Sequence, residues 1–99
     1  MLLGQVKTHV VSTAKLEGLA GKRLLLVAIA TVGSQGLEPT GRHMVCVDTV
    51  GAGEGDLVLV VMGNSSRIAP GMEAVPTDAV IVGIIDSLQA FGQDLAWKL

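Results

Sequence analysis

Residues Asp48–Asp56 place three glycines at alternate positions between two apolar runs, His43–Val47 and Leu57–Met62. This spacing requires backbone freedom, and glycine-rich loops often bind phosphate through their backbone N–H groups. The dinucleotide-binding fingerprint continues into a helix, however, whereas the run after this loop has the composition of a strand. The lysine of a P-loop is also absent from the loop. The stretch is therefore interpreted as a strand–loop–strand connection.

Patterns typical of β-strands recur along the chain. Period-two alternation and short runs rich in Val, Ile and Leu predict five strands, at Leu2–Thr13, Lys22–Ile29, His43–Val47, Leu57–Met62 and Ala79–Leu88. Glycines and a proline predict an exposed loop over Thr31–Arg42, and a helix of one or two turns is expected between Asn64 and Pro70. A turn at Gly92 and a last edge strand over Asp94–Leu99 complete the prediction.

This order of elements predicts an all-β fold. Five short strands with one small helix favour a compact, partly open β-barrel of the oligonucleotide/oligosaccharide-binding (OB) type, and a small sandwich is the alternative. The length of 99 residues supports a single domain that spans residues 1–99.

The first two predicted strands differ in how their faces are covered. In the first, Gly4, Val6, Thr8 and Val10 are expected to share one face, with Lys7 and His9 on a more polar one. Lys22–Ile29 is apolar on both faces, which indicates a core on one side and a subunit contact on the other.

The composition also indicates assembly. Apolar residues make up 49% of the chain and charged residues 16%, with a mean hydropathy of +0.59. A small domain has too much surface to hide that many apolar side chains internally. We therefore expect a sizeable apolar area to be buried against other chains.

Several classes of function are disfavoured by what the sequence contains. The longest apolar runs fall short of the ~20 residues of a membrane-spanning helix, so no membrane association is expected. A single cysteine, Cys46, allows no internal disulfide and agrees with a reducing cytoplasm. The net charge of −2, with only Phe91 and Trp97 as aromatics, does not suit nucleic-acid binding.

No catalytic, cofactor or metal site is predicted. His43 and Cys46 stand three apart on a strand, so they point to opposite faces and cannot share a metal ion. Cys46, between two valines, is expected to be a small buried apolar residue. The acids at strand ends, such as Asp48, are expected to bond local backbone N–H groups. Arg67 is open to two interpretations, a solvated side chain or one that reaches a neighbouring chain.

Four stretches of the sequence resemble a known family. They are Val10–Lys15 with Leu19–Lys22, Val47–Asp56, Gly63–Arg67, and Pro76–Ala79 running into Gly83–Asp86. Together they are similar to the pentameric vertex proteins of bacterial microcompartment shells, of the EutN/CcmL type. Asn64, Ser66 and Thr77 depart from the family's usual residues.

The resemblance implies a small barrel, five copies arranged as a tapered disc, and a structural role without catalysis or a cofactor. Such a pentamer would close the five-fold vertices of a shell in the bacterial cytoplasm that is otherwise tiled by hexameric proteins. The alternative function is an OB-type module that binds oligonucleotide or oligosaccharide, which the fold alone favours. A small enzyme is disfavoured, because the sequence offers no paired catalytic groups.

The family-like residues without a catalytic explanation are expected at the subunit contact or the central axis. They are Asp48, Thr49, Gly51, Ala52, Gly53, Gly63, Ser65 and Arg67.

Overall fold

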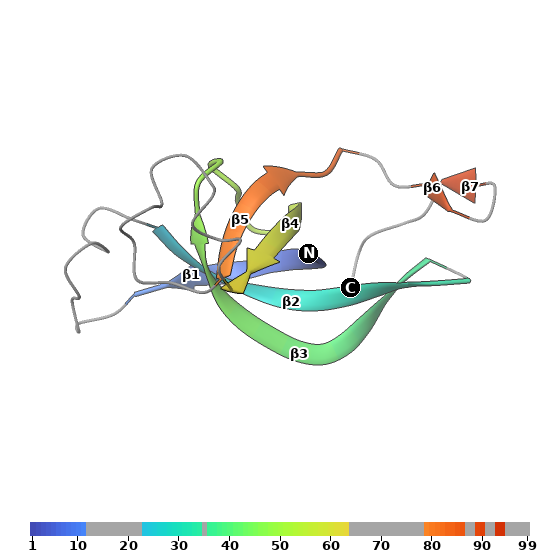
Figure 1. Ribbon diagram of the computed structural model, residues 1–99, viewed down its shortest axis with the longest axis horizontal. Coiled ribbons are helices and arrows are strands. Elements are labelled where there is room, and N and C mark those ends of the chain that lie inside the picture. The colour runs from blue at the N-terminus through green and yellow to red at the C-terminus, as the bar shows by residue number, and fades with distance from the viewer. Residues whose placement is uncertain (12–22, 35, 64–78, 87–88, 91–92, 95–99) are drawn as a thin grey trace.

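The computed structural model describes residues 1–11, 23–34, 36–63, 79–86, 89–90 and 93–94. Its strands are β1 (Leu2–Val10), β2 (Arg23–Gly33), β3 (Gly36–Asp48), β4 (Leu57–Met62), β5 (Ala79–Ile84), β6 (Gln89–Ala90) and β7 (Gln93–Asp94). The first five close into a barrel in the order β1-β2-β3-β5-β4, and β6 pairs with β7 separately (Figure 1). The predicted all-β barrel is confirmed. None of the described residues belongs to a helix that is long and apolar enough to cross a membrane.

The barrel closes through one parallel contact. β3 and β5 pair in parallel at Val47↔Val80 and Asp48↔Ile81, whereas the other neighbouring strands of the barrel are antiparallel. β5 therefore lies between β3 and β4, although β4 follows β3 in the sequence. The glycine loop, residues Asp48–Asp56, must consequently carry the chain past β5 at one end of the barrel.

The core fills the barrel with residues from all five strands and one residue of the glycine loop. The buried cluster consists of Val6, Leu25, Val27, Ile29, Cys46, Ala52, Val58, Val60, Ala79 and Ile81. Full burial of a side chain such as Leu25 contributes about 2 kcal/mol relative to exposure. The prediction that Cys46 is a buried apolar residue is confirmed.

A second, smaller apolar cluster lies on the opposite face of the sheet. Val47 and Val80 are buried there, with Leu24, Val61 and Val82 packed against them. Leu24 and Leu25 are consecutive on β2 and thus point to opposite faces, so this strand is apolar-packed on both sides as predicted. The subunit contact that was expected on one of these faces remains a prediction.

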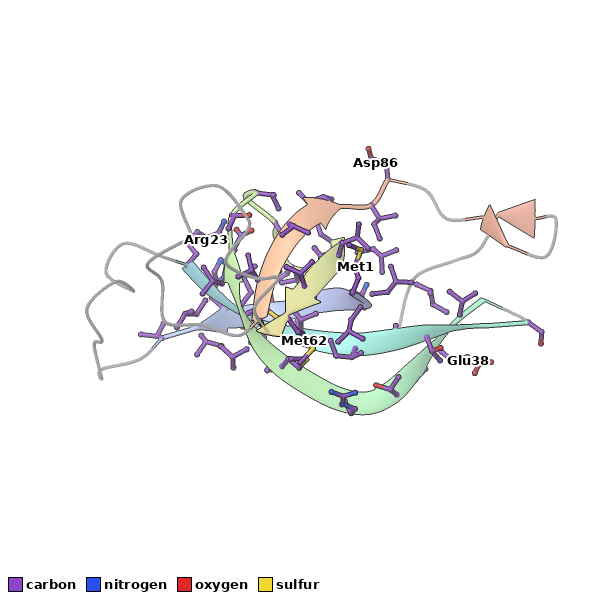
Figure 2. All side chains as sticks on the ribbon, in the orientation of Figure 1. Met1, Arg23, Glu38, Met62 and Asp86 are labelled. Atoms are coloured by element: carbon purple, nitrogen blue, oxygen red, sulfur yellow. The ribbon has the colours of Figure 1, made fainter. Side chains whose placement is uncertain are left out.

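The predicted loop at Thr31–Arg42 is wrong, because these residues extend the β2–β3 pair into a long ribbon. Thr31 pairs with Glu38, Val32 with Leu37 and Gly33 with Gly36. The ribbon projects beyond the barrel, and Glu38 lies on this projection (Figures 1 and 2).

Pro39 and Gly41 of this ribbon lie at an irregularity in the strand pairing. The register shifts between Ala28 and Ala30, opposite the segment that begins at Pro39, and Gly41 adopts a positive φ of 81°. Such a bulge is a place where proline and glycine are tolerated within a strand. Sequence patterns that normally indicate a loop therefore mark a bulged strand here.

β1 also departs from the predicted alternation. A β-bulge at Lys7 separates the pairs Val6↔Val27 and Thr8↔Leu26, and His9 then pairs with Leu25. Because Leu25 and Val27 share a face of β2, the bulge places His9 on the face of Val6, where Thr8 was expected. The predicted assignment of alternate β1 residues to one face is therefore correct up to Val6 and wrong after it.

The remaining boundaries agree in part. β4 has the predicted bounds, whereas β5 ends at Ile84 rather than at Leu88. The helix expected between Asn64 and Pro70 lies outside the described residues, as does most of the edge strand expected over Asp94–Leu99.

A Gly4→Ala substitution tests how closely β1 and β2 approach. A Cβ at Gly4 would overlap Val27 Cγ1 and lie 2.9 Å from the carbonyl oxygen of Ala28, so the backbone has to shift. We expect a loss of about 1–3 kcal/mol in the free energy of unfolding, measured by urea denaturation. The matched control is Gly83→Ala on β5, whose Cβ would meet Leu59 Cδ1 at an ordinary distance of 3.8 Å. Equal stability of the two variants would contradict the close approach.

Candidate functional site

The glycine loop is organised by the carboxylate of Asp48, the last residue of β3. Its side chain is 1% exposed. Oδ1 accepts hydrogen bonds from the backbone N–H groups of Val50 at 3.1 Å and Gly51 at 3.2 Å, and Oδ2 accepts one from Ala52 at 3.1 Å. Aspartate at the end of a strand commonly accepts from N–H groups two to four residues further on. The prediction of local backbone bonding is confirmed for Asp48.

Arg23 neutralises this buried carboxylate from the opposite strand. It stands directly across from Asp48 in the β2–β3 register, and its Nη1 donates to Asp48 Oδ2 at 2.9 Å. Its Nη2 donates to the carbonyl oxygen of Ala52 at 3.1 Å and lies 2.6 Å from Nε2 of His9. The guanidinium thus joins β1, β2, the end of β3 and the loop.

The far end of the loop is attached to β1. Gly55 N–H donates to the carbonyl of Val6 at 2.9 Å, and Val6 N–H donates to the carbonyl of Asp56 at 3.0 Å. Nε2 of the buried Gln5 donates to the carbonyl of Gly55 at 3.1 Å. The Asp56 carboxylate in turn accepts from Gly53 N–H at 2.9 Å. Both ends of the loop are therefore bonded to the barrel.

Thr49 adds a bond to the strand that the loop passes. Its Oγ1 donates to the carbonyl oxygen of Ile81 on β5 at 2.7 Å. Because Ile81 also pairs with Asp48, this bond holds the start of the loop against the parallel β3–β5 contact.

Two of the loop glycines are required by backbone conformation. Gly51 and Gly55 have φ values of 80° and 87°, a region that side-chain-bearing residues rarely adopt, and a Cβ at either would meet no atom within 4 Å. Crowding by the described residues therefore does not explain them, and their backbone conformation does.

The geometry gives a physical reason against the phosphate interpretation of the loop. A phosphate cradle needs free backbone N–H groups. The N–H groups of Val50, Gly51 and Ala52 already donate to the chain's own Asp48 carboxylate. Among the described residues, no group of three or more His, Cys, Asp or Glu side chains could hold a metal ion.

The predicted site residues fall into three groups. Asp48 and Ala52 are buried inside the chain, whereas Thr49, Gly51 and Gly63 are exposed and Gly53 is half-buried. Ser65 and Arg67 lie outside the described residues. The loop residues are brought together, and Gly63 follows the end of β4 with a φ of 63°. Their place at a subunit contact remains a prediction.

Three residues of the site were missed by the sequence analysis: Arg23, His9 and Gln5. Nothing in their local sequence marks them, because Arg23 opens an apolar run and the other two alternate along β1. Their roles depend on strand register, which sets Arg23 across from Asp48 and the bulged β1 beside the loop. The one hint in the sequence was the pair of opposite charges at strand ends, with Asp48 after an apolar run and Arg23 at the start of another.

Comparisons with known proteins give consistent matches over most of the chain. The sequence model of the family described as "Ethanolamine utilisation protein EutN/carboxysome" matches residues 1–86. The bacterial microcompartment shell vertex protein GrpN of Rhodospirillum rubrum is 46% identical over 89 residues, which cover 90% of this chain and 97% of GrpN.

Solved structures match as well. The pentameric microcompartment shell protein GrpN from R. rubrum superposes with a TM-score of 0.79 at 44% identity, over 91% of this chain and 99% of that one. The structure of CcmL from Gloeobacter violaceus superposes with a TM-score of 0.85 at 34% identity, over 97% of this chain and 96% of that one.

An Asp48→Asn substitution tests the carboxylate as the organiser of the loop. It removes the charge that pairs with Arg23 and turns one acceptor into a donor that faces backbone N–H groups. Because the Arg23 side chain is 45% exposed, we expect a moderate loss of about 1–3 kcal/mol in the free energy of unfolding. Urea denaturation measures it, with the exposed Asp86→Asn as control. Identical unfolding midpoints for the two variants would contradict the assigned role.

Proposed function

The chain belongs to the EutN/CcmL family of ethanolamine-utilisation and carboxysome proteins, and from this premise we propose that it is a structural, non-enzymatic subunit of a bacterial microcompartment shell, placed at the shell's vertices. One observation carries the proposal: nine-tenths of the chain superposes on the pentameric shell protein GrpN at 44% sequence identity. The protein resides accordingly in the microcompartment shell. The matches to solved structures extend over 97% of the chain, which supports residues 1–99 as one domain.

The oligomer is a pentamer. A ring of identical subunits uses a heterologous interface, in which one patch of each subunit meets a different patch of the next. The apolar content of the chain, with Val45 and Ile84 exposed on its strands, supplies surface for such contacts. The neighbours of the ring are flat hexameric shell proteins, because a hexagonal layer needs five-fold units to close into a polyhedron.

The glycine loop and the residues that follow β4 in the sequence form the subunit contact or line the central axis. Asp48 and Ala52 are buried and contribute indirectly, because the hydrogen bonds of Asp48 hold the loop in one conformation in the single subunit. Thr49, Gly51 and Gly53 present the loop's outer backbone, and Gly63, Ser65 and Arg67 contribute the second segment. A loop that is already ordered loses little conformational entropy on association, which favours assembly.

Native mass spectrometry of the purified protein tests the oligomeric state. We expect a discrete species at five times the 10.2 kDa chain mass. A stable monomer, or a hexamer as the main species, would contradict the pentamer.

A pair of asparagine substitutions tests the placement of the loop. Gly51 and Gly41 are both exposed, have φ near 80°, and would meet no atom within 4 Å with a Cβ added. Asparagine tolerates this backbone region, so Gly51→Asn and Gly41→Asn should fold with similar stability. We expect the added side chain at Gly51 to raise the dissociation constant of the pentamer by about tenfold or more. The reason is that the core of an interface is closely packed and has no room for an extra side chain. Analytical ultracentrifugation measures this.

Gly41, on the projecting β2–β3 ribbon, is the matched control. Pentamers of equal strength in both variants and in the parent would place Gly51 away from the subunit contact. An equal loss in both would show that the contact is not specific to the glycine loop.

A further inference from the structure

His9 makes a contact that is possible in only one of its protonation states. Nη2 of Arg23 lies 2.6 Å from Nε2 of His9. A guanidinium carries only N–H donors and stays protonated in proteins. Nε2 must therefore present its lone pair to Arg23, so the imidazole is neutral and carries its proton on Nδ1.

The β-bulge at Lys7 is what brings His9 to Arg23. With regular pairing Thr8 would stand opposite Leu25, but after the bulge His9 takes that place. Arg23 and Leu25 share a face of β2, so His9 becomes the neighbour of Arg23 on that face. Bulges commonly re-aim a side chain in this way.

The charges around His9 make the contact sensitive to its protonation. Among the described residues, the surrounding elements carry Lys7 on β1, Arg23 on β2, Glu54 and Asp56 in the glycine loop, and Asp48 at the end of β3, with Glu38, Arg42 and His43 earlier on that strand. Lys7 Nζ is turned to Gln5 Oε1, and the Asp56 carboxylate is bonded within the loop. The charged group that contacts His9 is the Arg23 cation, which also pairs with Asp48.

We propose that His9 is a proton-sensitive contact that couples pH to the order of the glycine loop. When Nε2 takes up a proton from solvent, it loses the lone pair that accepts from Arg23 and becomes a like charge beside the guanidinium. Arg23 then loses its attachment to β1. Since the same Nη2 also donates to the Ala52 carbonyl, the loop loosens as Arg23 moves. The contact is present while the His9 imidazole is neutral, on the alkaline side, and is lost when Nε2 binds a proton at lower pH.

Amide hydrogen exchange of the full-length protein at pH 7.5 and pH 5.5 tests this coupling. The readout is the protection factor of the Gly51 and Ala52 amides, corrected for intrinsic exchange and referenced to the core amide of Val58. We expect protection in the parent to fall by about threefold to tenfold at pH 5.5, the size of effect that a partly exposed charge contact produces. Unchanged relative protection in the parent would overturn the proposal.

Two variants identify the group responsible. In His9→Gln the amide oxygen can accept from Arg23 without titrating, so the loss at pH 5.5 should disappear. His43→Gln, at an exposed position on β3, should behave like the parent. A loss that persists in His9→Gln, or that vanishes in His43→Gln, would overturn the assignment to His9.

A measurement on the unaltered protein is independent of how the variants fold. The ¹⁵N chemical shifts of the imidazole nitrogens at pH 7.5 distinguish the two neutral tautomers. We expect Nδ1 of His9 to be protonated and Nε2 to be bare. An Nε2–H tautomer would overturn the proposal, because it leaves no acceptor for Arg23. Neither experiment requires a pentamer, so the outcome is separate from that of the proposed shell function.

Discussion

The buried carboxylate of Asp48 is the group on which the conformation of the glycine loop and its end of the barrel depends. A carboxylate without partners could not be buried to this degree, because its desolvation would cost several kcal/mol. Here three successive backbone N–H groups and the Arg23 guanidinium surround it, so its charge and its acceptor capacity are both satisfied. The loop is thereby held in one conformation by a group from its own chain. A residue that looked like an ordinary strand-end aspartate is the organising element of the site.

The position of the loop follows from the way the barrel closes. Strands adjacent in sequence usually pair, but β5 inserts between β3 and β4 and pairs in parallel with β3. The loop must pass the end of β5, and Thr49 bonds to Ile81 as it does so. The backbone bonds of Gly55 and Asp56 to Val6 then hold the end of the loop against β1, and β4 continues from there as the antiparallel partner of β1. Because both ends of the loop are bonded to the closed barrel, the loop has one defined position at this end of the molecule.

Two irregularities in strand pairing show how a local register shift decides which side chains meet. The bulge near Gly41 lets the β2–β3 ribbon continue beyond the barrel despite Pro39, and its exposed residues form a projection on which Glu38 stands (Figure 2). The bulge at Lys7 reverses the face on which His9 lies and brings it to Arg23. A shift of one residue at Lys7 and of two residues opposite Ile29 decides which side chains can meet.

The sequence by itself determined the fold class, the bounds of β4, the burial of Cys46 and the local bonding of Asp48, since these depend on short-range hydrophobic pattern and turn chemistry. The family resemblance, in turn, was carried by contiguous motifs such as Val47–Asp56, which need no three-dimensional information. Only the tertiary structure decided that Thr31–Arg42 belongs to a ribbon with a register shift. In the sequence, a glycine that marks the end of a strand cannot be told from one that marks a bulge within it. The tertiary structure alone also decided that Gln5 and Arg23 bond to the glycine loop and that His9 contacts Arg23. Those contacts join residues 14 to 50 positions apart through strand register, and register follows from the closure of the whole barrel.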